Sequence, residues 1–203
     1  MTRRSILAIW CLALLTGCAS GPAPRIYVLS TPATPINDVR LESGRPIVEL
    51  KPVSLPDYLD TSDLLIRNGR NELTVSATAR WGERLSIGTT HALAAALVGR
   101  MPGMTIVTTP VYQRPARVIR VEIDAFDMLP DGRCILVARW VVDGSDRRVP
   151  SISERGSVTT RVTGGLMTDA AIVAAMAEAI DKLADYIAAA GSRGPGSRGP
   201  GAL

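Results

Sequence analysis

Apolar and polar residues alternate along much of the chain with the period of a β-strand. The clearest alternation covers residues 119–125, where every second residue from Ile119 to Ala125 is apolar and the residues between them are charged. Residues 134–142 alternate in the same way after an Asp131-Gly132 turn, so the two runs predict an antiparallel hairpin. Shorter apolar runs predict further strands at residues 25–29, 46–50, 64–67, 72–79, 105–107 and 152–162.

Two segments have the pattern of helices. Residues 85–100 are rich in Ala and Leu and end at Met101-Pro102-Gly103. In residues 168–190 the apolar residues recur every three or four positions and line one face, which we expect to pack on a sheet. These are Ile172, Met176, Ile180, Leu183 and Ile187. The order of elements predicts an α/β fold: a two-layer sandwich with a mixed, mostly antiparallel sheet and two main helices on one face. The other face is left to solvent or to a partner.

The first residues have the pattern of an export signal. Arg3 and Arg4 precede the apolar residues 6–15, a run too short to cross a bilayer of about 30 Å as a helix. The run ends in Leu-Thr-Gly-Cys, the bacterial lipobox, after which Cys18 receives diacylglycerol and acyl chains such as palmitate. We therefore expect a lipoprotein signal peptide at residues 1–17 and a tether at residues 18–24 that starts at the lipidated Cys18. An ordinary signal peptide with an incidental Cys is the alternative.

Length and composition leave room for one domain, which we place at residues 25–190. The chain has 203 residues, a formal charge of +4, one His and three Cys. A charge this small and scattered gives no reason to expect nucleic acid. Once Cys11 and Cys18 are removed or lipidated, Cys134 has no partner for an intramolecular disulfide, so we expect it in the core. Residues 191–203 repeat the unit SRGPG and are expected to be a disordered tail.

Candidate catalytic and metal-binding patterns are weak. The only His, His91, falls mid-helix, and the chain contains no G-x-S-x-G elbow. The carboxylates of Asp57, Asp60 and Asp63 lack the central Gly and the final Glu of a calcium loop. We therefore expect no enzyme, no metal and no cofactor.

Two segments carry aromatic side chains of the kind found in interfaces. Residues 52–60 read PVSLPDYLD and residues 80–85 read RWGERL. We select Leu55, Tyr58, Leu59 and Trp81 as candidates for contacts with a partner or within an oligomer. The alternative is that Tyr58 and Trp81 cap the ends of the core.

Taken in order, several of these features resemble one family. They are the lipobox, the strand at residues 27–29, the segments at 53–60 and 80–85, and the run VEIDAFD at 121–127. Together they resemble the ABC-type transport auxiliary lipoproteins, also called PqiC or YmbA-like, over roughly residues 18–190. The chain departs from the family where it has WGERL in place of WAEPL.

The resemblance implies a function at the bacterial envelope. Such a lipoprotein is expected on the periplasmic side of the outer membrane, as a homo-oligomeric ring. Its expected partner is an MCE-domain protein with its inner-membrane permease system, which moves lipid between the two membranes and supports envelope integrity. The alternative is an outer-membrane lipoprotein that regulates or assembles another envelope machine, such as a cell-wall synthase or a secretion system.

Overall fold

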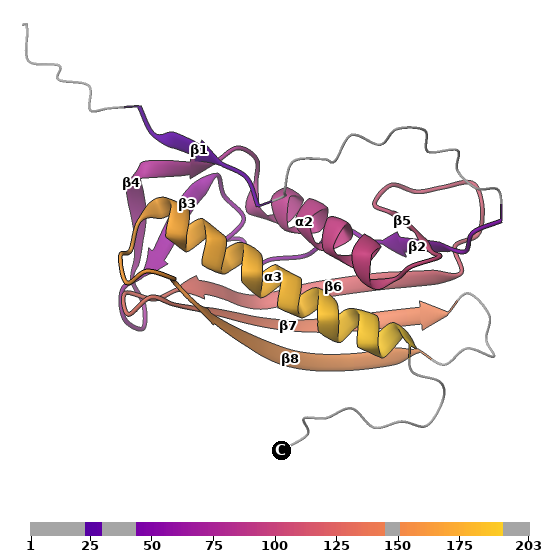
Figure 1. The fold of residues 1–203 in the computed structure, drawn as a ribbon. Helices are drawn as coiled ribbons and strands as arrows, with labels where there is room; N and C mark the ends of the chain where they lie inside the picture. The colour runs from indigo at the N-terminus through magenta and orange to yellow at the C-terminus, as the bar shows by residue number, and fades with distance from the viewer. Residues whose placement is uncertain (1–22, 30–43, 145–150, 193–203) are drawn as a thin grey trace, which may run out of the picture.

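A computed structural model describes residues 23–29, 44–144 and 151–192 (Figure 1). The predicted signal peptide, Cys18 and most of the tether lie outside the described residues, as does the tail from residue 193. The elements follow the predicted order closely, and the last helix continues two residues beyond the predicted end of the domain. They are β1 (Arg25–Tyr27), β2 (Ile47–Leu50), β3 (Asp63–Arg67), β4 (Leu73–Trp81), α2 (Leu85–Arg100), β5 (Thr105–Val107), β6 (Arg117–Met128), β7 (Arg133–Gly144), β8 (Ile152–Arg161) and α3 (Asp169–Ser192).

The strands divide into two mixed sheets. The larger has the order β5-β2-β6-β7-β8, with β2 parallel to both neighbours and with β6, β7 and β8 antiparallel. The smaller has the order β1-β4-β3. The predicted α/β class with a mixed, mostly antiparallel sheet is confirmed, and the division into two sheets is an addition to it.

Two prolines explain where the sheets separate. After β2 the chain stays beside β6, because Lys51 N–H donates to the Ile119 carbonyl at 2.9 Å and Ser54 N–H donates to the Val121 carbonyl at 3.1 Å. Pro52 and Pro56 have no N–H to give, so this stretch cannot continue as a regular strand. The chain then turns away from β6, and β3 pairs with β4 instead.

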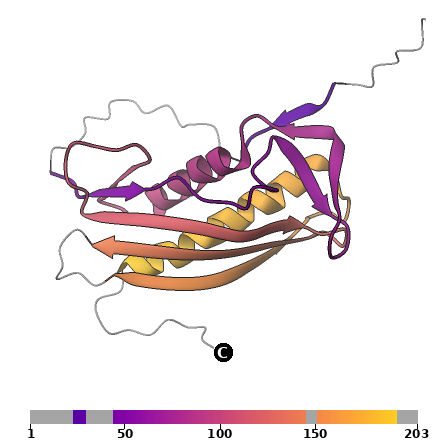
Figure 2. The same cartoon turned by 180° about the vertical axis from the view of Figure 1, so that it is seen from behind.

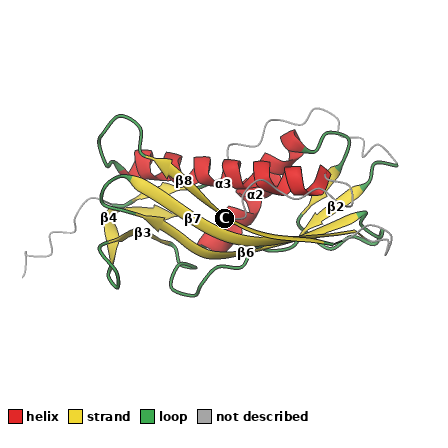
Figure 3. Ribbon diagram, turned by 90° about the horizontal axis from the view of Figure 1, so that it is seen from below, coloured by secondary structure: helices red, strands yellow, loops and turns green. Residues whose placement is uncertain are grey.

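The two helices form one layer over the larger sheet. Figure 3 shows α2 and α3 on one side of β6, β7 and β8, and Figure 2 shows the opposite face of that sheet without a helix over it. The predicted apolar face of α3 is buried at all five positions from Ile172 to Ile187. The α3 residues that pack in the core are therefore the ones that the helical spacing of apolar residues predicts.

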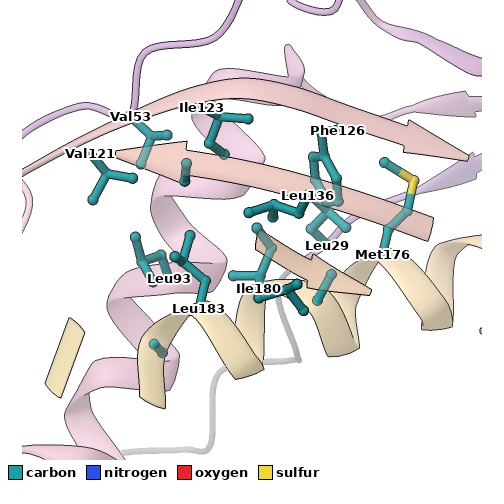
Figure 4. Close-up of a cluster of buried hydrophobic side chains, with 14 of the residues drawn as sticks. Leu29, Val53, Leu93, Val121, Ile123, Phe126, Leu136, Met176, Ile180 and Leu183 are labelled. Atoms are coloured by element: carbon teal, nitrogen blue, oxygen red, sulfur yellow. The ribbon is translucent and has the colours of Figure 1, made fainter. Parts of the chain in front are cut away.

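A β-bulge shifts the second half of β6. The register between β6 and β7 changes between Ile123 and Ala125, so Phe126 and Met128 point into the core where the sequence alternation predicts Ala125. Figure 4 shows Ile123 and Phe126 on the same side of β6, toward the α3 residues Met176 and Ile180. The sequence alternation thus predicts the inward-facing residues of β6 correctly up to Ile123 and wrongly beyond it.

Candidate functional site

The two aromatic-bearing segments lie against each other in the structure. Trp81 N–H donates to the Ser62 carbonyl at 2.8 Å, and Leu85 N–H donates to the Thr61 carbonyl at 3.2 Å. We call residues 53–63 together with residues 80–86 the junction. It connects the end of the larger sheet, the smaller sheet and the start of α2.

Asp60 is the polar centre of the junction. Its Oδ1 accepts a hydrogen bond from Ser86 N–H at 3.0 Å, and its Oδ2 lies 2.7 Å from Arg84 Nη2. Burial opposes the ionisation of Asp60, but the hydrogen bonds from Ser86 and the charge of Arg84 outweigh it and lower the pKa of this carboxyl. The ionised Asp60 therefore caps α2 from a distant loop.

A buried threonine fixes the other end of the segment. Val53 N–H donates to Thr90 Oγ1 at 2.9 Å, and the same hydroxyl donates to the Ser86 carbonyl at 2.7 Å. Val53 and Thr90 are both buried. The segment is thus attached to the first turns of α2 at both ends and has little freedom to move.

The four predicted contact residues belong to the junction but differ in exposure. Leu59 and Trp81 are buried in the core, with exposed fractions of 2% and 5%, and Leu55 is half-buried against it. Tyr58 is 43% exposed. The core position of Trp81 agrees with the core-cap alternative for that residue. Tyr58 alone of the four offers a large side-chain surface to a partner, and the contact role of all four stays a prediction.

Tyr58 lies over an ion pair that joins the two sheets. Arg67 Nε, from β3, lies 2.9 Å from Asp127 Oδ2, from β6. The guanidinium of Arg67 lies 5.7 Å from the centre of the Tyr58 ring, and its Nη2 donates to the Tyr58 hydroxyl at 3.3 Å. Burial alone would lower the pKa of Arg67, but Asp127 and Tyr58 raise it. We call these three residues the Tyr58 cluster.

Sequence reasoning did not find the Tyr58 cluster. Its members come from a loop, from β3 and from β6, and no local spacing links Arg67 to Asp127. The alternation of β6 in the sequence would place Asp127 on the inward face, and only the bulge turns it outward toward Arg67. In the structure the Arg67–Asp127 pair supports the Tyr58 ring through the cation–π contact and the hydrogen bond to its hydroxyl.

Most of the residues considered for chemistry have structural partners. His91 is exposed on α2, as a mid-helix position suggests, and its Nδ1 lies 3.4 Å from Glu83. Asp63 pairs with Arg80, as Asp60 does with Arg84. No group of three or more His, Cys, Asp or Glu side chains that could hold a metal occurs in the described segments. Cys134 is buried as predicted, and burial raises the pKa of its thiol to about 12.

The comparison with protein families decides the identity. The model of the family described as "ABC-type transport auxiliary lipoprotein component" matches residues 27–188. The chain belongs to this family. The matched range includes both segments of the junction and all of the described strands, apart from the first two residues of β1. The protein is thus an auxiliary lipoprotein of an ABC-type transport system, as the resemblance implies.

Solved structures share the fold of this auxiliary lipoprotein. A crystal structure of an uncharacterized protein superposes with a TM-score of 0.70 at 16% identity, covering 84% of this chain and 100% of that one. Protein XCC0632 from Xanthomonas campestris superposes with a TM-score of 0.58 at 14% identity, covering 84% and 95% of the two chains. These likenesses concern the fold alone. The search of curated proteins found no match. In the described part of the chain, neither α2 nor α3 meets the length and hydropathy required of a membrane-spanning helix.

Proposed function

We propose that this auxiliary lipoprotein is held on the periplasmic side of the outer membrane by acyl chains on Cys18. There it docks an MCE-domain protein that belongs to an inner-membrane permease system. In this proposal it catalyses no reaction of its own. Docking lets lipid pass between the two membranes and thereby supports envelope integrity. Family membership supports the transport role, and the resemblance of the junction segments supports the partner.

The observation that carries the proposal is the exposed Tyr58 on a fixed base. Tyr58 is 43% exposed, yet Arg67 and the attachment of its segment to α2 restrict its motion. A preorganised aromatic side chain loses little conformational entropy when a partner covers it. Such a residue is a suitable anchor for a protein interface.

The proposal also includes self-association into a homo-oligomer. β8 is a ten-residue strand at the edge of the larger sheet, and the face of that sheet opposite the helices is uncovered among the described residues (Figure 2). Edge strands carry unpaired backbone groups that can bond to another chain. Sedimentation of the lipidated protein in mild detergent measures the oligomeric state, and a monomer at all concentrations contradicts this part of the proposal.

The test of docking is site-specific photo-cross-linking in intact cells. A photoreactive amino acid replaces Tyr58 in one strain and Tyr112 in a control strain. Tyr112 is fully exposed and lies in the loop between β5 and β6. We expect the probe at position 58 to capture an MCE-domain protein and the probe at position 112 not to capture it.

Other outcomes of the same experiment contradict the proposal. Capture of a cell-wall synthase or of a secretion component at position 58 supports the alternative envelope role. Capture of the MCE protein equally from both positions removes the assignment to Tyr58.

A Cys18→Ala variant is expected to fold, to remain unattached to the membrane and to fail to complement a deletion, and complementation by it contradicts the need for an anchor. A His91→Ala variant is expected to complement fully, and loss of function in it would point to a hydrolase instead.

A further inference from the structure

Strand β1 and the residues that follow it have apolar side chains on both faces. Tyr27 and Leu29 face the core, and Leu29 is buried. Ile26 and Val28 point the other way and are 63% and 52% exposed. The outward face of an edge strand normally carries polar side chains. Two large aliphatic residues side by side on that face therefore call for an explanation beyond folding.

A glycine lets these two side chains form one continuous surface. Gly82 N–H donates to the Tyr27 carbonyl at 2.7 Å, which holds the connection between β4 and α2 against β1. A Cβ atom at Gly82 would lie 3.2 Å from both Ile26 Cγ2 and Val28 Cγ1, closer than such contacts normally are. Because Gly82 has no side chain, Ile26 and Val28 lie directly over its backbone. We call Ile26, Val28 and Gly82 the β1 patch.

The length of chain before β1 limits what the patch can meet. Six residues lie between Cys18 and Arg25, so seven Cα-to-Cα steps join the two. At about 3.3–3.6 Å per residue they reach at most about 25 Å when fully extended. If Cys18 is acylated, as the proposed function requires, β1 is the first described strand after the anchor and cannot lie farther from it than this length. Arg25 is exposed at the start of β1, on the opposite side of the strand from Ile26 and Val28, and its positive charge at this end of the domain adds attraction to anionic headgroups.

The arrangement of the molecule separates this end from other exposed residues. Figures 1 and 2 both show β1 at one end and the loop between β5 and β6 at the other. Tyr112, in that loop, is therefore on a part of the surface remote from the patch. Val75, which is 47% exposed, lies in β4, the strand that pairs with β1, and so provides an exposed aliphatic control at the same end of the molecule.

We propose that the β1 patch rests on the surface of the phospholipid bilayer that holds the acyl anchor. Ile26 and Val28 enter the headgroup region, and the charge of Arg25 at the start of the strand adds attraction to anionic lipid. The anchor and the patch together give two points of attachment, so the domain has one orientation on the membrane instead of moving freely on its tether. This inference rests on the proposed function only in requiring acylated Cys18.

The buried thiol of Cys134 makes a direct test possible. Because Cys134 is buried and its pKa is about 12, a thiol reagent at neutral pH reacts with a newly introduced surface Cys instead. Val28→Cys, Ile26→Cys, Val75→Cys and Tyr112→Cys variants of the lipidated full-length protein are labelled with an environment-sensitive fluorophore. They are reconstituted in phosphatidylethanolamine vesicles that contain a minor share of phosphatidylglycerol, with and without nitroxide-labelled headgroups.

We expect the nitroxide lipids to quench the probes at positions 26 and 28 several-fold more than the probes at positions 75 and 112. Equal quenching at all four positions overturns the inference. A blue-shifted but unquenched probe at position 28 also overturns it, because a second copy of the chain then covers the patch. Flotation of the same samples distinguishes a missing acyl anchor from a missing contact between the β1 patch and the bilayer. Protein that does not float with the vesicles contradicts the acyl anchor itself, whereas protein that floats with equal quenching contradicts only the contact of the patch.

Discussion

The carboxylate of Asp60 caps helix α2 by accepting a hydrogen bond from Ser86 N–H at 3.0 Å, although Ser86 comes 26 positions later in the sequence. Arg84, the residue that precedes the helix, supplies no side-chain cap, and the first turn contains no acidic residue. The start of α2 is therefore stabilised by a loop that comes before both strands of the β3–β4 hairpin. The junction and the first turn of α2 depend on each other.

Replacement of Asp60 should destabilise the protein through the helix terminus. Asp60→Ala removes the cap and the partner of Arg84, and we expect a loss of about 1–2 kcal/mol in the free energy of unfolding. Asp60→Asn keeps an oxygen acceptor and should lose less. Urea unfolding of both variants measures the effect, with Asp57→Ala as a control because Asp57 is exposed. A loss in the control equal to that of Asp60→Ala contradicts the capping role.

The same contact predicts a pH dependence. The pKa of Asp60 is lower in the folded protein than its ordinary value of 3.8, so ionised Asp60 contributes stability above that pH. This contribution is lost as the pH falls through the lowered, folded-state pKa. The difference in stability between the wild type and Asp60→Asn should therefore be constant near neutral pH and shrink in acid below about pH 4. A difference that persists unchanged in strong acid would argue against the ionised cap.

The packing of Trp140 predicts an effect of a single methyl group. A Cβ atom at Gly156 would lie 3.0 Å from Trp140 Cη2, and the indole is also stacked with Tyr186, with ring centres 6.2 Å apart. Gly156→Ala should displace the indole and cost about 1–3 kcal/mol, with a change in tryptophan fluorescence. A second substitution, Trp140→Phe, should relieve most of this cost in a double-mutant cycle.

A glycine with open space around it provides the control for Gly156→Ala. No atom lies within 4 Å of a Cβ built at Gly99, which is exposed on α2. Gly99→Ala should therefore stabilise the protein by about 0.5–1 kcal/mol, because alanine favours the helix. If both glycine variants are destabilised alike, contact with Trp140 is not the cause.

The elements of this fold are visible in the sequence because each one carries its own periodicity. The face of α3 from Ile172 to Ile187 and the inward face of β6 up to Ile123 follow directly from periods of about 3.6 and 2. The bulge that brings Phe126 inward is set by the pairing with β7, so the spacing of residues in β6 cannot reveal it. The separation into two sheets likewise depends on which strands pair, although Pro52 and Pro56 mark the place.

The candidate site was predictable as two segments but not as one junction. Aromatic residues drew attention to Tyr58 and Trp81, and these look alike in sequence. Tertiary packing makes them different, since Trp81 is buried while Tyr58 stays exposed over Arg67. The contact from Asp60 to Ser86 and the ion pair from Arg67 to Asp127 join residues distant along the chain, and no local pattern encodes them.

The thiol of Cys134 should be unreactive until the protein unfolds. Burial raises its pKa from about 9 to about 12, so the folded protein disfavours the thiolate. The unfolded chain deprotonates first, and the stability that the neutral thiol contributes is complete below pH 9 and decreases as the pH rises toward 12. At pH 10 this loss is about 1.4 kcal/mol. The free energy of unfolding of the wild type should therefore decrease more steeply between pH 8 and pH 10 than that of Cys134→Ala. Equal slopes, or rapid labelling of the folded protein by a thiol reagent at pH 8, would contradict the buried state.

Substitutions at Trp81 and Tyr58 should separate folding from docking. Trp81 is 5% exposed and belongs to the core, so Trp81→Ala should cost about 3–5 kcal/mol and lower the amount of protein in cells. Tyr58 is 43% exposed and contributes one cation–π contact, so Tyr58→Ala should cost only about 0.5–1 kcal/mol.

The effect on assembly should run in the opposite order once expression is matched. Tyr58→Ala should reduce co-purification of the MCE-domain protein, because the exposed ring is lost while the fold remains. Tyr58→Phe retains the ring and loses the hydroxyl that accepts from Arg67, and it should keep most of the binding. Thermal unfolding and quantitative pull-down from the same membranes give the two readouts. A Tyr58→Ala protein that melts several degrees lower but binds its partner normally would make Tyr58 a cap of the Arg67–Asp127 pair and not a docking residue.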